Sequence, residues 1–303
     1  MSIRFEGRVA IITGAGGGLG REHALLLAQL GAKVVVNDPG VSVSGDGDDS
    51  SAAERVATEI RAAGGEATVS TDTVTDPESA RRIVQTALDA YGRLDILINN
   101  AGILRDRSFG KMDLSDFQSV MDVHLYGAVY CTKAAWPVMT GQRYGRIVVT
   151  TSPSGYSGIF GQSNYAAAKL AVLGFMRVLA LEGAKHNVLV NAISPSAATR
   201  MTEGIIDPRL ARYMRPALVS PAVAFLCSEA FQESAVIISA MGGHFATIQM
   251  CETTGVQFDP RTPVSPDMVS ESYERICQLK TLAPLSQDPM GDLEKRLQQM
   301  GVV

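Results

Sequence analysis

The sequence predicts an α/β protein built on a doubly wound parallel β-sheet with helices on both faces. Over about the first 195 of its 303 residues, short apolar runs alternate with longer segments of helical periodicity. The short runs are rich in β-branched residues and end at turn residues, as buried parallel strands do. Strands that alternate with helices and are joined by right-handed crossovers favour the doubly wound arrangement.

The elements follow in order along the chain. Strands are expected at residues 9–13, 33–37, 66–70, 94–98, 146–150 and 188–193, and helices at 19–30, 51–63, 77–90, 120–139 and 164–182. Gly31 follows the first helix, where a glycine commonly ends one. Asp76 and Pro77 begin the third helix as an N-cap and as a proline at the first helical position.

Two segments interrupt this alternation. Residues 39–50 are rich in Gly, Ser and Asp and are expected to form a surface loop. Asp46, Asp48 and Asp49 lie in that loop, but their spacing is not that of an EF-hand, and no metal site is predicted. The other segment is a tail with several prolines and a helical pattern at 270–279. We therefore expect a main domain at 1–257 and an accessory extension at 258–303.

Composition and charge disfavour several classes of protein. The formal net charge is −4 and no block of Lys and Arg is present, which argues against nucleic acid as a partner. No run reaches the roughly 20 apolar residues of a spanning helix, and the first residues lack the apolar core of a signal peptide. The four cysteines are scattered, as in proteins of a reducing compartment. A cytoplasmic protein with no membrane partner is expected.

The turn after the first strand is rich in glycine. Residues 13–20 read TGAGGGLG and join a predicted strand directly to a predicted helix. Glycines at 14, 18 and 20 allow a tight turn and the close approach of a pyrophosphate to helix N–H groups. An ordinary glycine-rich turn is the alternative, but this context is the one that dinucleotide binding requires. No Gly-Lys-Ser/Thr follows, which disfavours a nucleoside-triphosphate site.

A carboxylate follows the second strand. Asp38 lies 18 residues beyond Gly20, where it can accept hydrogen bonds from ribose hydroxyls and repel a 2′-phosphate. Asp38-Pro39-Gly40 is alternatively only a turn. Because no basic residue stands nearby at Gly17 or Asn37, NAD is favoured over NADP.

A tyrosine and a lysine share one face of a predicted helix. Tyr165 and Lys169 are four residues apart, so their side chains lie one turn apart. An ammonium beside a phenol favours the phenolate and lowers the pKa of the tyrosine, as a base for an alcohol requires. Ser152 follows the fifth strand, from which its hydroxyl can reach the same site. Taken alone, such a Tyr/Lys pair is more often a solvated helix face.

Together these residues resemble the short-chain dehydrogenase/reductase family. The resemblance covers residues 5–245 and rests on the glycine turn, on Asn99-Asn100-Ala101-Gly102, on Ser152 and on Tyr165-x-x-x-Lys169. Within the family the chain particularly resembles the (3R)-hydroxyacyl-CoA dehydrogenase part of peroxisomal multifunctional enzyme type 2 and its bacterial relatives. The shared stretches include residues 35–38, 99–109, 161–165 and 200–202, and those relatives also extend past the usual family length.

The resemblance implies a Rossmann-like fold, NAD as cofactor and a role for each matching residue. Tyr165 is the general acid/base, Lys169 lowers its pKa and holds the nicotinamide ribose, and Ser152 orients the reacting oxygen. The cofactor residues it implies are Gly14, Gly18 and Leu19 at the pyrophosphate, Asp38 at the adenosine ribose, Asp72 and Thr73 at the adenine, and Asn100 and Ala101 at the far ribose, with Tyr165, Lys169 and Thr199.

Two positions depart from the family pattern, and a proline beside Ser152 is a further local feature. His124 stands where the family commonly has an asparagine that supports a water leading to the lysine. This histidine either serves the proton relay or is only packed in the core. The usual Pro-Gly after the sixth strand is Pro195-Ser196, and Pro153 directly follows the catalytic serine.

Residues 197–218 have little regular pattern and are expected to cover the substrate as a lid. The arginines at 200, 209, 212 and 215, with those at 105 and 107, either meet coenzyme A phosphates or form a solvated surface. The expected reaction is NAD-dependent oxidation of a secondary alcohol, with a (3R)-hydroxyacyl-CoA as the preferred small-molecule substrate and a hydroxysteroid or steroid-CoA as the alternative. A non-catalytic NAD-binding regulator is the alternative of another class.

Small-residue and apolar faces are expected on the helices at 120–139 and 164–182. The resemblance implies that these faces meet across a two-fold axis, in a homodimer or homotetramer. Core packing alone is the other explanation.

Overall fold

The computed structural model describes residues 2–47, 49, 51–203, 206–279, 282–284, 294–295 and 297–301. The chain divides into two compact units, Met1–Thr247 and Ile248–Val303. The division lies ten residues before the boundary expected after residue 257. Among the described helices, none has both the length and the apolar character needed to cross a membrane.

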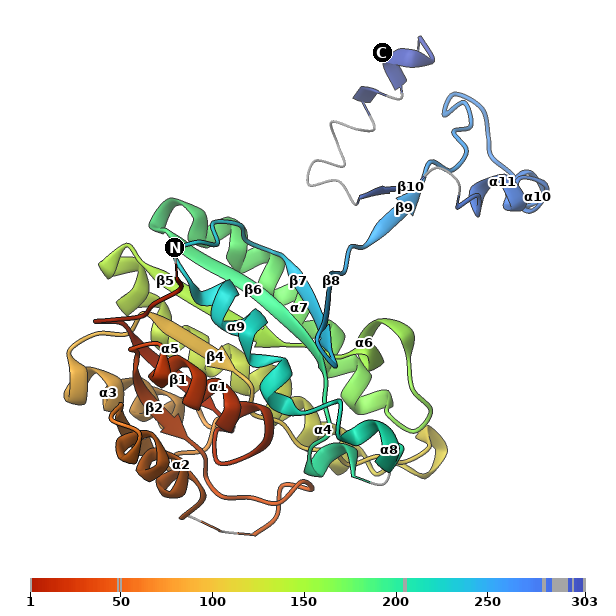
Figure 1. Cartoon of the computed structure of the whole chain (residues 1–303). Helices are drawn as coiled ribbons and strands as arrows, with labels where there is room; N and C mark the ends of the chain where they lie inside the picture. Colours follow the sequence, from red (N-terminus) through yellow and green to blue (C-terminus); the bar gives the residue numbers. More distant parts are fainter. Residues whose placement is uncertain are drawn as a thin grey trace. The chain divides into compact units, whose positions relative to one another are not determined.

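The first unit is built on a single sheet whose strands run in the order β3-β2-β1-β4-β5-β6-β7-β8 (Figure 1). The strands are β1 Val9–Thr13, β2 Lys33–Asn37, β3 Glu66–Ser70, β4 Ile96–Asn99, β5 Gly145–Thr150, β6 Val188–Ser196, β7 Ile237–Met241 and β8 His244–Thr247. Each neighbouring pair is parallel except β7 and β8, which are antiparallel. The predicted doubly wound α/β class is thus confirmed.

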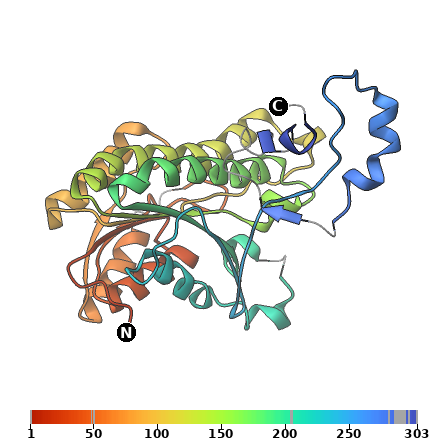
Figure 2. The ribbon, with the colours of Figure 1, turned by 90° about the horizontal axis from the view of Figure 1, so that it is seen from above.

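Helices cover both faces of the sheet (Figure 2). On one face lie α1 (Gly18–Gln29), α2 (Ser51–Ala62) and α9 (Ser220–Cys227), and on the other lie α3 (Pro77–Tyr91), α5 (Gly127–Gln142) and α7 (Ser163–Gly183). Shorter helices complete the unit: α4 (Leu114–Met121), α6 (Pro153–Ser157) and α8 (Pro208–Ala211).

Local sequence explains most of these boundaries. All five residues of β1 and all six of β5 are buried, so their apolar runs need no alternation. At the start of α3 the Asp76 carboxylate accepts a hydrogen bond from the Ser79 N–H at 2.7 Å, and Gly92 ends the helix with φ +75°. The expected strands at 9–13, 33–37 and 66–70 have the observed boundaries, and the other three differ by one to three residues.

Elements beyond residue 196 were largely missed. The seventh strand begins within a β-branched run at 236–238, which is a strand signal, whereas β8 is exposed along its whole length and carries no such signal. In the second unit, helices α10 (Pro266–Glu271) and α11 (Tyr273–Ile276) replace the single helix expected at 270–279. Strands β9 (Cys251–Thr253) and β10 (Leu282–Pro284) pair antiparallel there and were not expected.

The strand order reverses between β1 and β4, which places a crevice at the carboxyl ends of these strands. The glycine turn follows β1, Asp38 follows β2, Asn100 follows β4 and Ser152 follows β5. Segments far apart in the sequence are therefore brought to one edge of the sheet.

At the opposite edge, a buried carboxylate ties three segments together. The Asp95 side chain is fully buried, and its oxygens accept hydrogen bonds from Arg8 at 2.9 Å, from Arg93 at 2.6 and 2.8 Å and from the Val9 N–H at 3.0 Å. Arg8 also pairs with Glu229, whose side chain is 69% exposed.

We expect Asp95→Ala to lower the free energy of unfolding by about 3–5 kcal/mol, because Arg8 and the Val9 N–H would lose a buried partner. Glu229→Ala, which removes an exposed partner of the same arginine, is the control and should cost less than about 1 kcal/mol. Urea denaturation of both variants measures the difference. Equal losses would contradict the role given to burial.

Candidate active site

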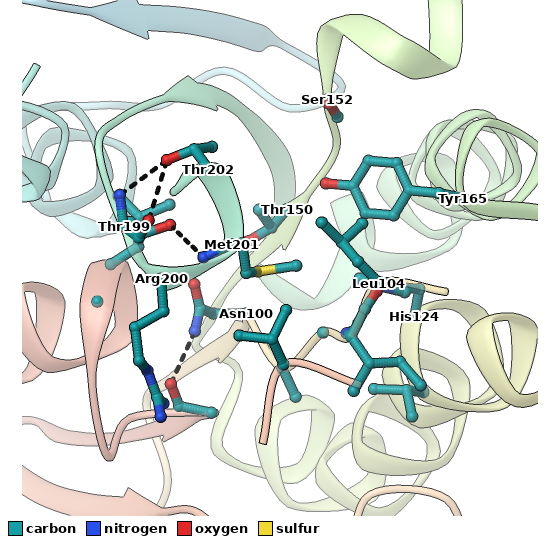
Figure 3. Close-up of a pocket in the computed structure, with 18 of the residues that line it drawn as sticks. Asn100, Leu104, His124, Thr150, Ser152, Tyr165, Thr199, Arg200, Met201 and Thr202 are labelled. Atoms are coloured by element: carbon teal, nitrogen blue, oxygen red, sulfur yellow. Dashed lines mark hydrogen bonds between the residues drawn. The ribbon is translucent and has the colours of Figure 1, made fainter. Parts of the chain in front are cut away.

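A cavity of about 730 Å³ opens at the carboxyl ends of the strands. Residues of the glycine turn and of the loops after β2, β4, β5 and β6 line it, together with Tyr165 and Lys169 from α7. In Figure 3, Ser152 and Tyr165 lie on one side, and the turn that contains Thr199, Arg200 and Thr202 lies on the other. The volume is in the upper part of the range found for small-molecule sites.

The glycine turn is packed against the loop after β4 too closely for side chains. A Cβ on Gly14 would lie 2.8 Å from the Ala101 Cα, and one on Gly20 would lie 2.2 Å from the Gly14 carbonyl oxygen. Gly14 also has φ +65°, a backbone conformation that favours glycine. The Asn100 amide donates hydrogen bonds to the Thr13 and Gly14 carbonyl oxygens at 2.9 and 3.1 Å. These contacts hold the two loops in one arrangement.

The turn leaves the start of α1 open. Its N-cap, Gly17, has no side chain to accept the first N–H groups, and the first turn of the helix carries no acidic residue. These N–H groups and the positive end of the helix dipole are therefore free to bind an anion. Gly17, Gly18 and Leu19 all line the cavity.

The Asp38 carboxylate is held in place by the backbone. Its Oδ2 accepts a hydrogen bond from the Gly16 N–H at 2.8 Å and its Oδ1 accepts one from the Gly40 N–H at 2.7 Å. Asp38 thus lines the cavity as a fixed negative group beside an anion-binding turn. A carboxylate for ribose hydroxyls next to an uncapped helix start for a pyrophosphate is the donor and acceptor set that a dinucleotide requires.

Tyr165, Lys169 and Ser152 converge on the same cavity. The Lys169 side chain is buried, its Nζ donates a hydrogen bond to the Thr150 carbonyl oxygen at 2.7 Å, and it lies 5.5 Å from the centre of the Tyr165 ring. Ser152 is the N-cap of α6, and its hydroxyl accepts a hydrogen bond from the Ser154 N–H at 3.3 Å. The fold thus brings these three side chains, which are distant or merely periodic in the sequence, to one site.

The expected lowering of the tyrosine pKa is not found in this state of the site. Burial raises the pKa of Tyr165, and a hydrogen bond with the Ser152 side chain offsets only part of that effect. Burial lowers the pKa of Lys169 to about 7. Desolvation disfavours each charged form, and it outweighs the attraction that the sequence argument considered. A neutral pair and a phenolate–ammonium pair hold the same number of protons, so a change in the site's polarity can convert one into the other without proton uptake.

His124 lies beside this pair in a π-helical turn, η2 (Asp122–Tyr126), between α4 and α5. Its ring meets the Tyr165 ring edge-on with centroids 5.0 Å apart. The Nε2 atom lies 2.8 Å from the Ile103 carbonyl oxygen and 3.0 Å from the Ile103 nitrogen, and the buried Nδ1 atom has no hydrogen-bond partner. Burial and the charge of Lys169 hold the pKa of His124 well below its usual value, so a neutral ring occupies this position.

Gly102 makes room for that ring. A Cβ at this position would lie 2.3 Å from the His124 Cε1 atom. The glycine in the Asn-Asn-Ala-Gly stretch is therefore required by packing against a side chain 22 residues away.

Most of the site residues expected from the sequence line this one cavity: Gly14, Gly18, Leu19, Asp38, Thr73, Asn100, Ala101, Ser152, Tyr165, Lys169 and Thr199. Asp72 does not line it, because its carboxylate accepts hydrogen bonds from Arg82 at 2.7 Å and from the Ser70 hydroxyl at 3.3 Å. Of the loop carboxylates considered for calcium, Asp48 lies outside the described residues. Among the residues that are described, no three His, Cys, Asp or Glu side chains gather as a metal site.

Three of the six arginines expected near coenzyme A phosphates contact other side chains of the protein. Arg209 pairs with Asp207 at 2.6 Å, and Arg212 lies over the Tyr213 ring at 4.6 Å. Arg105 lines the cavity but donates to Asp116 at 3.0 Å and to the Ser44 carbonyl oxygen at 2.9 Å, so that it fastens the 39–47 loop to the wall of the site. Only Arg105 and Arg200 of the six line the cavity.

A short hydrogen-bond chain beside the cavity was missed by the sequence reasoning. The Ser154 hydroxyl donates to the Gln162 Oε1 at 2.6 Å, and the Gln162 Nε2 donates to Asp106 at 2.7 Å. Ser154 and Gln162 line the cavity, and the chain links α6 to the loop after β4. The signal was present, because Gln162 and Asp106 lie in two of the stretches that carry the family resemblance.

We expect Lys169→Met to raise the free energy of unfolding at pH 7 by about 2–4 kcal/mol. The folded-state pKa near 7 lies below the ordinary 10.5, so the unfolded chain binds the extra proton and the wild type is destabilised. That penalty is complete below pH 7 and disappears as the pH rises to about 10.5. Urea denaturation at several pH values measures the trend.

Lys133→Met is the matched control for a lost lysine charge, because the Lys133 side chain is exposed. It should change the free energy of unfolding by less than about 0.5 kcal/mol at every pH measured. A Lys169→Met variant no more stable than the wild type at pH 7 would show that the buried lysine carries no desolvation cost.

Comparisons with known proteins agree with this geometry. A family model described as short chain dehydrogenase matches residues 8–209. The peroxisomal multifunctional enzyme type 2 of Drosophila melanogaster is 47% identical over 279 residues, which cover 91% of this chain and 46% of that protein. The chain thus spans less than half the length of this relative.

Two further proteins match over nearly their whole length. A short-chain type dehydrogenase/reductase of Mycobacterium tuberculosis is 45% identical over 90% of this chain and 95% of its own. The structure of a 7α-hydroxysteroid dehydrogenase, complexed with NADH and 7-oxo glycochenodeoxycholic acid, has a TM-score of 0.71 and 30% identity, and the match covers 79% of this chain and 95% of that one. With its sheet order, glycine turn and Ser/Tyr/Lys set, the chain belongs to the short-chain dehydrogenase family of oxidoreductases.

Proposed function

We propose that this chain uses NAD to oxidise the 3-hydroxyl group of a (3R)-hydroxyacyl-CoA to a ketone. The observation that carries the proposal is the convergence of Ser152, Tyr165 and Lys169 at one cavity that also holds the glycine turn and Asp38. The resemblance to the dehydrogenase part of multifunctional enzyme type 2 supports the choice of substrate class.

Three side chains divide the work on the alcohol. Tyr165, as phenolate, takes the proton from the substrate hydroxyl while the carbon loses its hydride and becomes a carbonyl. The Ser152 hydroxyl donates a hydrogen bond to the reacting oxygen, and the Lys169 ammonium supplies the positive field that favours the phenolate. When bound, NAD supplies the acceptor for the hydride. The Thr150 carbonyl oxygen and the edge of the His124 ring hold Lys169 and Tyr165 in place.

The preference for NAD over NADP follows from Asp38. Its carboxylate is fixed by two backbone N–H groups where a ribose hydroxyl would need an acceptor, and its charge would repel a 2′-phosphate. Thr73 and Val74 also line the cavity, whereas Asp72 does not, and we assign these two residues to the adenine.

The part of the cavity left for substrate has apolar walls. Its lining includes Ile103, Leu104 and Ile159, together with Met201, Ile206 and Met214 of the lid. Such walls suit the acyl chain of a thioester. They also suit a fused-ring steroid, and the likeness to a 7α-hydroxysteroid dehydrogenase makes a steroid the second candidate.

The assembly and cellular location belong to the proposal as well. Leu170, Val178 and Leu181 on α7 are 40%, 54% and 64% exposed, and Tyr126 and Tyr130 stack at the start of α5. Burying these side chains against a second copy favours a homodimer, alone or within a tetramer. The expected cytoplasmic location stays a prediction, because the Drosophila relative carries the word peroxisomal in its name.

We expect Tyr165→Phe to lower kcat by at least about 1,000-fold, since the phenol is the only proposed base. NAD affinity should change little, because the ring and its packing remain. Steady-state kinetics and calorimetric titration with NAD measure the two quantities. Substantial residual turnover would contradict the assignment of the base.

The substrate is tested by following NADH formation at 340 nm with three alcohols: a medium-chain (3R)-hydroxyacyl-CoA, its 3S epimer and a hydroxysteroid. We expect turnover of the 3R thioester, and more of it with NAD than with NADP. Turnover of the steroid alone would leave the proposed catalytic residues unchanged and would assign a hydroxysteroid as the substrate. Silence with all three alcohols in a chain that binds NAD would support a non-catalytic regulator instead.

A further inference from the structure

We propose that Arg200, from the lid, binds the pyrophosphate of the dinucleotide cofactor opposite the start of α1. The inference rests on the dinucleotide cofactor of the proposed function. It gives the lid arginine a different ligand from the coenzyme A phosphates considered above.

The backbone around Arg200 is built to hold it in one direction. Arg200 begins a short 3₁₀ turn, η4 (Arg200–Thr202), which Thr199 and Thr202 close with reciprocal hydrogen bonds. The Thr199 hydroxyl accepts from the Met201 N–H at 3.2 Å, and the Thr202 hydroxyl accepts from the Thr199 N–H at 2.8 Å and donates to the Ala197 carbonyl oxygen at 2.9 Å. A turn closed at both ends gives its first side chain a defined starting direction.

That direction leads to the glycine turn. Figure 3 shows the Arg200 side chain extending from the η4 turn toward the N-terminal segment of the chain. Its Nη2 atom lies 3.5 Å from the position that a Cβ on Gly17 would occupy. The Thr199 Cγ2 atom lies 3.6 Å from the position of a Cβ on Gly18. The guanidinium therefore lies beside the N-cap of α1, where the uncapped N–H groups already favour an anion.

No carboxylate neutralises this arginine. Among the described residues, Arg200 makes no ion pair or side-chain hydrogen bond, whereas Arg209 and Arg105 are both paired with aspartates. A guanidinium and a helix N-terminus would repel each other slightly across an empty site. A doubly charged pyrophosphate between them satisfies both, and a guanidinium can bind two phosphate oxygens at once.

Arg200 also borders a smaller cavity of about 280 Å³ beside Asp38, where the 2′-phosphate of NADP would have to lie. Asp38 and Asp49 line that cavity and Arg55 is already paired with Asp49 at 2.8 Å, so a phosphate there would meet two carboxylates. The pyrophosphate position, which faces N–H groups and no carboxylate in the first turn of α1, is the more favourable of the two.

The test is a calorimetric titration of the full chain with NAD, ADP-ribose, adenosine and NADP, which needs no turnover. We expect Arg200→Ala to weaken NAD and ADP-ribose binding by about 10- to 100-fold, as the loss of hydrogen bonds to a charged group predicts. Adenosine, which has no phosphate, should bind as it does to the wild type. Arg200→Lys should recover part of the loss, because it keeps the charge without the two-pronged contact.

Arg215→Ala is the matched control, since it removes an arginine of the same lid that does not line the cavity. Melting curves of the unliganded variants should coincide with the wild type, because the exposed Arg200 side chain supports no other residue. The proposal is overturned if Arg200→Ala binds ADP-ribose as tightly as the wild type does.

A selective loss of NADP binding would also overturn it, and would assign Arg200 to the 2′ position. Failure of the proposed function looks different: the wild type would bind NAD, with the Arg200 effect intact, and oxidise none of the alcohols tested.

Discussion

The close contact between the turn after β1 and the loop after β4 is the constraint on which the rest of the site depends. Gly14 allows the two backbones to approach, Gly20 leaves room for the Gly14 carbonyl oxygen and the Asn100 amide, and that amide joins the two loops by two hydrogen bonds. Because the strand order reverses between these strands, this contact forms one side of the crevice. A side chain at either glycine would separate the loops, and the open start of α1 would no longer face the cavity.

Burying the proposed catalytic pair, Tyr165 and Lys169, carries a desolvation penalty. Lys169 is buried next to Tyr165, and burial moves the pKa of each group toward its neutral form. Burial therefore disfavours the Tyr165 phenolate that the proposed mechanism requires. The proposed function thus depends on two buried polar side chains that lower the stability of the fold.

Electrostatics also organises the walls of the site. Arg105 fastens the loop after β2 to α4, and the Ser154–Gln162–Asp106 chain fastens α6 to the loop after β4. Arg105, which the sequence analysis considered for coenzyme A phosphates, is thus held by contacts within the protein. Of the two lid and loop arginines that line the cavity, Arg105 is paired with Asp116, whereas Arg200 has no ion pair among the described residues and lies beside Gly17 of the glycine turn.

The sequence by itself determined six strands of the sheet and most of its helices, and it singled out Ser152, Tyr165 and Lys169 as the candidate catalytic residues. Buried strands such as β1 and β5 can be recognised by their short apolar runs. The four-residue spacing of Tyr165 and Lys169 places both side chains on one helix face without reference to the rest of the fold. Tertiary structure alone decided that Asp72 turns to Arg82, that His124 is neutral and that the tyrosine pKa rises. The physical reason is that periodicity is a property of neighbouring residues, whereas the energy of a charge depends on burial and on partners distant in the chain.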